Sequence, residues 1–183
     1  MGKQRYYVAI VPEGEIQTQL QELKLHISEE YKTRAAMKSP AHITLFPPFE
    51  VDENMEMLLR HTLDRTVTLF QPFDLITNNF DYFPPRVAFV AIEPHEKLDK
   101  LERAVRHHLK ELSFLRNTKI QSHFHPHITL GNRDWIPEQF EACRKELQTM
   151  TFREKLSVKD VCLLRYNLMQ WEVIHRTPLP GNA

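Results

Sequence analysis

The sequence is poor in cysteine and glycine, and its net charge is zero. Its two cysteines, Cys143 and Cys162, cannot supply a disulfide framework or a four-thiolate zinc site. Its 24 basic side chains are balanced by 24 acidic ones. Proteins that hold long nucleic acids by bulk electrostatics carry an excess of Lys and Arg. The balance therefore argues against that mode of binding and leaves open a small or locally held anion.

Long apolar runs are also missing. No run reaches the roughly 18 residues that a membrane span needs, and residues 1–15 lack the apolar core of a signal peptide. We therefore expect a soluble protein of the cytoplasm that does not contact a membrane. Hydrophobic residues make up 42% of the chain, which is enough for the core of one domain or of two small packed lobes.

The chain contains an internal repeat. The pattern Val-Ala-Ile-x-Pro occurs at residues 8–12 and 90–94, and His-Ile-Thr-Leu occurs at 42–45 and 127–130. The two pairs of matches are offset by 82 and 85 residues. Two matches in the same order at nearly the same offset indicate a duplicated unit, with repeat units of about 5–82 and 86–178.

The pattern of apolar residues predicts the same elements in both repeats. Residues 5–11 and 86–92 are β-branched and aromatic runs that predict buried strands. Each is followed by apolar residues three or four positions apart, which predict amphipathic helices over 16–31 and 98–112. The other predicted elements are helices over 55–63 and 136–147 and strands over 69–80, 152–165 and 170–177.

The order β-α-β-α-β, read twice, predicts an α+β fold. We expect a single bilobal domain over residues 1–183, with two antiparallel-sheet lobes, outer helices and a central cleft. A pseudo-twofold axis would relate the two lobes.

The duplicated motif places two kinds of reactive side chain together. Alternate side chains of a strand share a face, so His42 lies with Thr44 and His127 lies with Thr129. Histidine titrates near neutrality, so one imidazole can accept a proton while the other donates one. Threonine hydroxyls can donate hydrogen bonds to phosphoryl oxygens as negative charge builds up. This combination suits phosphoester chemistry.

The paired motifs at 42–45 and 127–130 resemble those of the 2H phosphoesterase superfamily, and the nearest branch looks like the 2′-5′ RNA ligase-like and cyclic phosphodiesterase proteins. The resemblance covers nearly the whole chain. It implies a metal-independent, cofactor-free enzyme acting on 2′,3′-cyclic phosphates or 2′-5′ phosphodiester bonds in nucleotides or at RNA ends. Hydrolysis is favoured over ligation in dilute water.

The resemblance also implies roles for the motif residues. His42 and His127 would form the general acid/base pair, and Thr44 and Thr129 would hold the phosphate. The symmetry of the motifs leaves open which histidine is the acid and which is the base.

Several basic residues near the motifs are candidates for binding the substrate. Arg133 lies just past the second motif, and a basic residue recurs at this place in relatives; alternatively, it pairs with Asp134 at the surface. Lys38 and Arg165 are weaker candidates of the same kind.

Recognition of a base usually needs an aromatic surface for stacking. Of the aromatic residues available, we choose Phe46, because it directly leaves the first motif strand. Phe46 begins the run Phe-Pro-Pro-Phe, where many relatives carry a glycine-containing turn. The other candidates are Tyr7, Tyr82, Phe83 and Trp171.

Two alternatives use the same residues differently. His123, His125 and His127 alternate along the chain, which suggests a His-rich metallohydrolase. Pro126 interrupts this run, and the first repeat has no matching histidines. The second alternative is a non-catalytic module that binds RNA ends or nucleotides. In each case we expect a monomer with no obligate protein partner.

Overall fold

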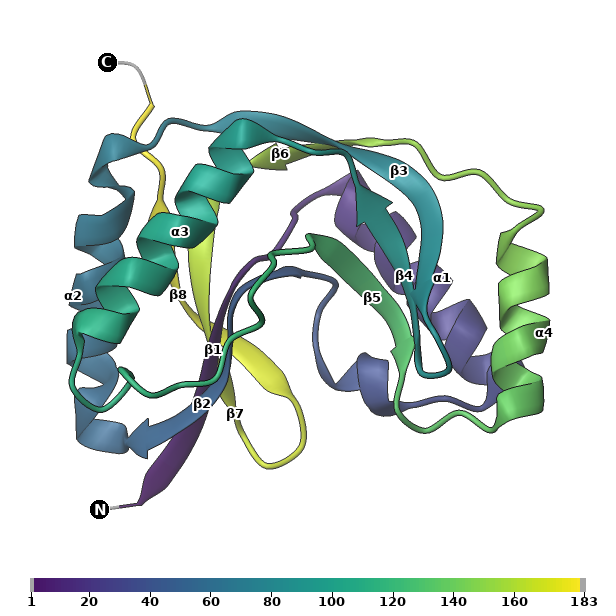
Figure 1. Cartoon of the computed structure of the whole chain (residues 1–183), viewed down its shortest axis with the longest axis horizontal. Coiled ribbons are helices and arrows are strands. Elements are labelled where there is room, and N and C mark those ends of the chain that lie inside the picture. Colours follow the sequence, from purple (N-terminus) through teal and green to yellow (C-terminus); the bar gives the residue numbers. More distant parts are fainter. Residues whose placement is uncertain (1, 182–183) are drawn as a thin grey trace.

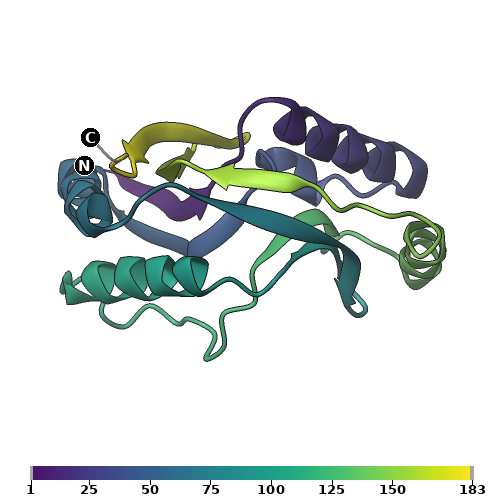
Figure 2. The same cartoon turned by 90° about the horizontal axis from the view of Figure 1, so that it is seen from above.

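The computed structural model describes residues 2–181, which form an α+β protein with one curled antiparallel sheet and helices packed against it (Figures 1 and 2). The predicted order β-α-β-α-β occurs twice, and three further short helices are 3₁₀. The strands are β1 (Lys3–Ile10), β2 (Ile43–Asp52), β3 (Phe73–Phe83), β4 (Val87–Ile92), β5 (His127–Asn132), β6 (Lys155–Val158), β7 (Asp160–Tyr166) and β8 (Trp171–Pro178). The helices are α1 (Glu15–Tyr31), α2 (Glu56–Thr66), α3 (Glu96–Glu111) and α4 (Pro137–Leu147), with η1 (Ala35–Lys38), η2 (Glu53–Met55) and η3 (Val67–Leu69) between them.

The sheet has two halves that meet between β2 and β5. Its strand order is β6-β3-β4-β5-β2-β1-β7-β8, with all neighbouring strands antiparallel. The two central strands are paired at one position, Ile43 opposite Ile128. This pair, which we call the seam, joins the two motif strands of the repeats. The expected α+β fold with two antiparallel halves is therefore confirmed.

The helices are exchanged between the repeats. Helix α1 precedes β2 in sequence but packs against β5, and α3 precedes β5 but packs against β2. Helices α1 and α4 contact each other at one end of the molecule, and α2 and α3 contact each other at the other end (Figure 1). Each motif strand is thus covered by the helix of the other repeat. The repeat boundaries, 5–82 and 86–178, stay a prediction about the sequence, because each half of the sheet takes strands from both units.

The segment predicted as one strand over 152–165 is two strands. Residues of β6 pair with β3 in one half, whereas β7 pairs with β1 and β8 in the other half. The chain crosses between the halves at Lys159, the residue between the two strands. Strand β6 alternates between exposed and buried positions, whereas β7 is buried at four consecutive positions, 161–164. The prediction of one strand overlooked this change of pattern.

A continuous apolar core lies between the sheet and its helices, and the helix periodicities predict most of it. The buried stripe of α3 contains Leu98, Leu101, Val105 and Leu109, as expected. On α1 the buried positions are Leu20, Lys24, Ile27 and Tyr31. The two cysteines are buried and free.

The seam gives a prediction about stability. Ile128 is fully buried, so Ile128→Ala removes buried methyl groups and leaves a cavity, and it should lower the free energy of unfolding by about 2–5 kcal/mol. Urea denaturation of the wild type and the variant measures this loss. Leu69→Ala is the control, because Leu69 is 92% exposed and should change stability by no more than about 0.5 kcal/mol. Equal stabilities of the two variants would contradict the packing described for the seam.

Candidate active site

The seam brings the two His-x-Thr motifs together. Ile43 and Ile128 face the core and are fully buried, so their neighbours in residues 42–44 and 127–129 face the opposite side of the sheet. All four of these neighbours are half-buried. They are His42, Thr44, His127 and Thr129. The pairing of Ile43 with Ile128 therefore puts the four motif side chains on one face of the sheet.

A pocket of about 200 Å³ opens on this face. Three of the four motif side chains line it, whereas the ring of His127 lies against Phe89 and Phe83, with centroids 5.0 and 5.3 Å away. His127 is nevertheless near enough to His42 to influence its titration. The lining residues are Tyr7, Lys24, Ala35, Ala36, Ser39, His42, Thr44, Pro48, Thr129, Asn132, Arg133 and Trp171.

The two histidines are held by the same local hydrogen bond. Nδ1 of His42 lies 2.8 Å from the carbonyl oxygen of Pro40, and Nδ1 of His127 lies 2.7 Å from that of His125. A carbonyl oxygen only accepts, so Nδ1 carries the proton in each ring. In the neutral state Nε2 then has its lone pair free. Each imidazole is therefore preset to take up or release a proton through Nε2.

Burial disfavours the charged form of both imidazoles. Burial, together with the charges of Lys24 and His127, lowers the pKa of His42 to about 4, although the hydrogen bond to Pro40 acts in the opposite direction. Burial also lowers the pKa of His127, with a further contribution from His125 and an opposing one from its carbonyl. Both rings are thus neutral near pH 7 without a ligand. A phosphate bound beside them would favour the protonated form again.

The two threonines line the pocket with free hydroxyl groups. Within residues 2–181, neither Thr44 nor Thr129 forms a side-chain hydrogen bond to another protein group. Both are half-buried and face the same side as the histidines. Their hydroxyls are therefore available as donors to a ligand in the pocket.

Arg133 also lines the pocket, and it does not pair with Asp134. It adopts a left-handed backbone conformation with φ of 70°, and its side chain is in no ion pair with the other described residues. Asp134 instead accepts hydrogen bonds from the Thr33 hydroxyl and from the backbone N–H groups of Arg34 and Ala35, the last two at 2.7 and 3.1 Å. This carboxylate ties the loop after β5 to the loop that leads into His42.

Phe46 is fully buried, and its ring packs edge-on against Phe49 at 5.5 Å. The sequence-based choice of Phe46 as a substrate contact is therefore corrected: it belongs to the core. Between Val8 and Ala9 of β1, the partner position on β2 moves by two residues, from 46 to 44. This β-bulge breaks the alternation of β2 and turns the Phe46 side chain inward.

Trp171, from the same group of aromatic candidates, lines the pocket. Its ring meets that of Tyr7 edge-on, with centroids 4.6 Å apart, and the Arg5 guanidinium lies 5.5 Å from its centre. Tyr7 also contacts the first motif, because its hydroxyl is 3.4 Å from Nδ1 of His42.

The other two aromatic candidates do not line the pocket. Phe83 packs against His127, and the Tyr82 hydroxyl donates a hydrogen bond to the carbonyl oxygen of Arg144.

The two weaker basic candidates lie elsewhere. Arg165 is paired with Glu56 of α2 at 3.2 Å, and Lys38 is exposed and does not line the pocket. Sequence reasoning missed three polar residues that do line it, Lys24, Ser39 and Asn132. The side-chain oxygen of Asn132 is buried there without a hydrogen-bond partner. The only sequence signal for Lys24 was its place on the apolar stripe of α1, and the only signal for Asn132 was its place shortly after the second motif.

The alternating histidines do not form a regular strand face. Strand β5 begins at His127, so His123 and His125 lie in the preceding loop, where Pro126 interrupts the pattern. Neither His123 nor His125 belongs to a cluster of three or more potential metal ligands within residues 2–181. The group found there is His107, His108 and Glu111 on α3, whose ligand atoms lie within 4.8 Å of one another.

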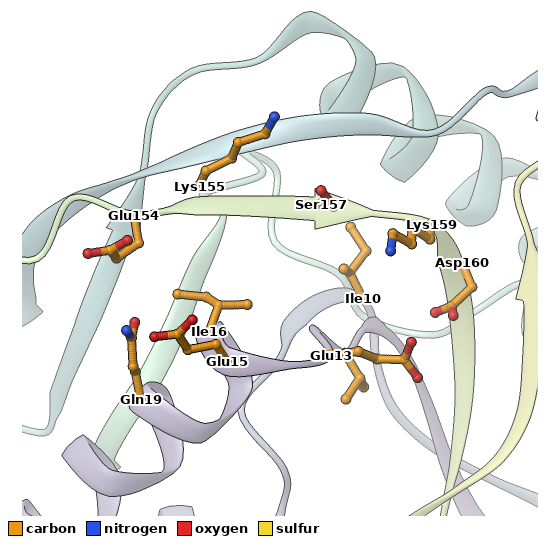
Figure 3. A pocket seen from close by; sticks show the side chains of 11 residues that line it. Ile10, Glu13, Glu15, Ile16, Gln19, Glu154, Lys155, Ser157, Lys159 and Asp160 are labelled. Carbon is orange, nitrogen blue, oxygen red and sulfur yellow. The ribbon is translucent and has the colours of Figure 1, made fainter.

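A second hollow, of about 310 Å³, lies between the start of α1 and β6 (Figure 3). Charged side chains of both signs surround it, including Glu13, Lys155 and Asp160. Arg176 pairs with both Glu13 and Asp160, so these carboxylates already have a cationic partner. None of the motif residues lines this hollow.

The chain belongs to the 2′-5′ RNA ligase superfamily, whose family profile matches residues 12–169. This is the class of 2H phosphoesterases that the duplicated motif resembles. An RNA 2′,3′-cyclic phosphodiesterase from Thermotoga maritima is 28% identical over 142 residues, which cover 75% of this chain and 74% of the relative. The family and this relative support 2H phosphoesterase activity.

Solved structures share the fold. TT0787 of Thermus thermophilus matches 98% of this chain and all of its own, with a TM-score of 0.73 and 23% identity. LigT of E. coli in its apo form matches 99% of this chain and all of its own, with a TM-score of 0.68 and 20% identity. The structure of LigT complexed with 3′-AMP has a TM-score of 0.67 and 23% identity, with coverage of 98% and 100%.

Within residues 2–181, no helix combines the length and the apolarity needed to cross a membrane.

The loop contacts of Asp134 predict a pH-dependent stability. Burial acts to raise the pKa of this carboxyl, but the hydrogen bonds from residues 33–35 outweigh it, so the pKa is lowered. The stabilisation is therefore present above the ordinary pKa of an aspartate and is lost as the pH falls through the folded-state value. Asp134→Ala should cost about 1 kcal/mol at pH 7, a value kept small because the carboxyl is solvent-exposed.

Urea denaturation at pH 7 and at about pH 3 measures this effect. The unfolding free energies of the wild type and of Asp134→Ala should differ at pH 7 and converge at the lower pH. Asp52→Ala, at the exposed end of β2, is the control and should differ in stability from wild type by no more than about 0.5 kcal/mol. A constant difference between wild type and Asp134→Ala across this pH range would contradict the account.

Proposed function

We propose that this chain is a metal-independent phosphodiesterase that hydrolyses 2′,3′-cyclic phosphates or 2′-5′ phosphodiester bonds in nucleotides or at RNA ends. The observation that carries the proposal is the seam, where one backbone pair sets both His-x-Thr motifs on the same face. Membership of the 2′-5′ RNA ligase superfamily and the named activity of the Thermotoga relative support it.

Two imidazoles provide the proton transfers of the proposed hydrolysis. One histidine accepts a proton at Nε2 from a water molecule as the water oxygen bonds to phosphorus. The other, protonated when the phosphate is bound, donates its Nε2 proton to the ribose oxygen as the P–O bond breaks. The product is a phosphomonoester, and one water molecule is consumed. The residues in these roles are His42 and His127.

Charge on the phosphoryl oxygens is stabilised by groups of the chain itself. The hydroxyls of Thr44 and Thr129 donate hydrogen bonds, and the guanidinium of Arg133 supplies a positive charge at the rim of the pocket. These groups cover the proton transfer and charge stabilisation that the reaction needs, so the proposed mechanism uses no metal. Ligation is the same chemistry in reverse and is secondary in dilute water.

The substrate in this proposal is a nucleotide or an RNA terminus. The pocket of about 200 Å³ is smaller than the roughly 300–1,000 Å³ of clefts that enclose drug-sized ligands, so it suits phosphate and ribose. The base would then lie along the rim, where Trp171 is available for stacking. We further propose that the enzyme acts as a monomer in the cytoplasm, a setting consistent with its two buried free thiols.

Loss of either imidazole tests the mechanism. His42→Ala and His127→Ala should each reduce turnover of 2′,3′-cyclic nucleotides by about 10²–10⁴-fold while leaving the protein folded, because each removes one proton transfer. Hydrolysis is measured in excess chelator, with circular dichroism as the check on folding.

His123→Ala is the matched control, since His123 is an exposed histidine of the loop before β5 and should keep full activity. Near-normal turnover by a folded His42 or His127 variant would remove that residue from the mechanism. Activity abolished by chelator would favour a metallohydrolase. Tight nucleotide binding without turnover of any cyclic or 2′-5′-linked substrate would favour the binding module.

Trp171 gives a separate test of base recognition. Because stacking of a base on an aromatic ring contributes about 1–3 kcal/mol, Trp171→Ala should raise the KM for a cyclic mononucleotide by about 5–150-fold with a smaller change in kcat. Trp171→Phe keeps a stacking surface and should retain most of the affinity. Unchanged KM in the alanine variant would place the base elsewhere.

A further inference from the structure

A lysine occupies a position of α1 where the helix otherwise buries apolar side chains. Lys24 follows Leu20 by four residues and precedes Ile27 by three, and it is only 1% exposed. Lysine is almost never fully buried unless its charge is paired. The packing of α1 alone does not account for this choice, because an apolar residue would fill the same stripe at lower cost.

The Lys24 ammonium is under-used as a hydrogen-bond donor. It donates a hydrogen bond to the carbonyl oxygen of Ser39. Within residues 2–181, no carboxylate forms an ion pair with it. An ammonium has three N–H donors, so the contacts with described residues leave donors unused. Burial lowers the pKa of Lys24 to about 8, so the side chain is still mainly charged at pH 7. A buried cation with spare donors therefore remains without a counter-charge.

The spare donors belong to the pocket of the candidate active site. Lys24 lines this pocket together with His42 and Thr129. Its charge contributes to the lowered pKa of His42 but not to that of His127. The lysine is therefore placed asymmetrically, beside one histidine of the pair.

We propose that Lys24 is an anion-binding residue of this pocket, whose ammonium contacts a non-bridging oxygen of the substrate phosphate. The inference rests on the proposed function and adds a phosphate contact from α1 to those expected from the motifs. A phosphate would supply both the missing counter-charge and the missing acceptors. Binding it would therefore recover the cost of burying the lysine.

The position of Lys24 also distinguishes the two histidines. The charged or titratable groups around His42 are Lys24 from α1, Tyr7 from β1, and His127 and Arg133 from β5 and the loop that follows it. The cation beside His42 disfavours its protonation, which suits the general base. His127 has no lysine beside it, and its titratable neighbour is His125 of the preceding loop. His127 is therefore the histidine that becomes protonated and serves as the acid.

Binding of inorganic phosphate tests the contact without relying on turnover. Lys24→Met keeps the length of the side chain but removes the charge, and it should weaken phosphate binding by about 10–100-fold. The affinity is measured by titration calorimetry and by the phosphate-dependent rise in Tm. Lys38→Met is the matched control, because Lys38 is an exposed lysine outside the pocket, and its affinity should stay within about twofold of wild type.

A merely structural lysine would give different results. If Lys24 served the fold, Lys24→Met would lower the Tm without phosphate, whereas relief of an uncompensated charge should leave the Tm unchanged or raise it. The folded-state pKa lies below the usual value of 10.5, so the wild-type protein should gain stability as pH rises from about 8 to 10.5. The methionine variant should lack this gain.

Turnover separates this inference from the proposed function. If the inference holds, Lys24→Met raises KM and moves the acidic limb of kcat/KM to higher pH, because His42 loses a neighbouring cation. Phosphate affinity within twofold of wild type in folded Lys24→Met overturns the inference, even if the wild type hydrolyses cyclic phosphates. Weakened phosphate binding in that variant, with no hydrolysis by the wild type, supports the anion site and overturns the proposed function.

A folding failure would not leave the inference untested. If both Lys24→Met and Lys24→Gln unfold, phosphate binding to the wild type is measured between about pH 8.5 and 10.5, where inorganic phosphate stays a dianion. Affinity that falls as the lysine loses its proton supports the contact. Affinity that is constant across this range overturns it.

Discussion

The single backbone pair between Ile43 and Ile128 is the constraint on which the site depends. The two motif strands come from different repeats and different halves of the sheet, so their relative position rests on few contacts. Both isoleucines of the seam are fully buried. Near them, Asp134 accepts a hydrogen bond from the loop that leads to His42. Gly131 adds a packing requirement, because a Cβ there would lie 2.3 Å from the ring of Trp135. Core packing and loop hydrogen bonds thus support the relative position of the two motif strands.

Symmetry and asymmetry have separate origins in this site. The duplicated chain gives each histidine the same Nδ1 partner, the carbonyl two residues earlier, so both rings present Nε2. A phosphoryl transfer with one acid and one base nevertheless needs two imidazoles in different protonation states. The difference comes from what surrounds the strands. His42 shares its pocket with Lys24, whereas His127 packs against Phe83 and Phe89.

Much of the fold could be predicted because its signals are local. Strand and helix periodicity gave the order of the elements, and the repeated motif gave the two histidines and two threonines. What depends on the tertiary structure could not be read. A bulge on β2 turned Phe46 into the core, and the crossing at Lys159 divided a predicted strand into β6 and β7. Lys24 escaped notice because a lysine within a helical pattern is normally at the surface. Only the packing of α1 under the other repeat's strand buries it beside His42.

The exchanged helices account for how a chain with no net charge would hold the proposed anion. Phosphate binding by bulk electrostatics needs an excess of cations over a broad surface, which this sequence does not have. A cation inside a pocket acts at short range and in a lower dielectric, where its interaction with a phosphate is stronger and less screened by salt. Because α1 packs against β5, it places Lys24 in the pocket that Thr44 and Thr129 also line. Burial of this unpaired charge destabilises the ligand-free protein. A phosphate monoester or diester is the kind of ligand that offsets this loss of stability.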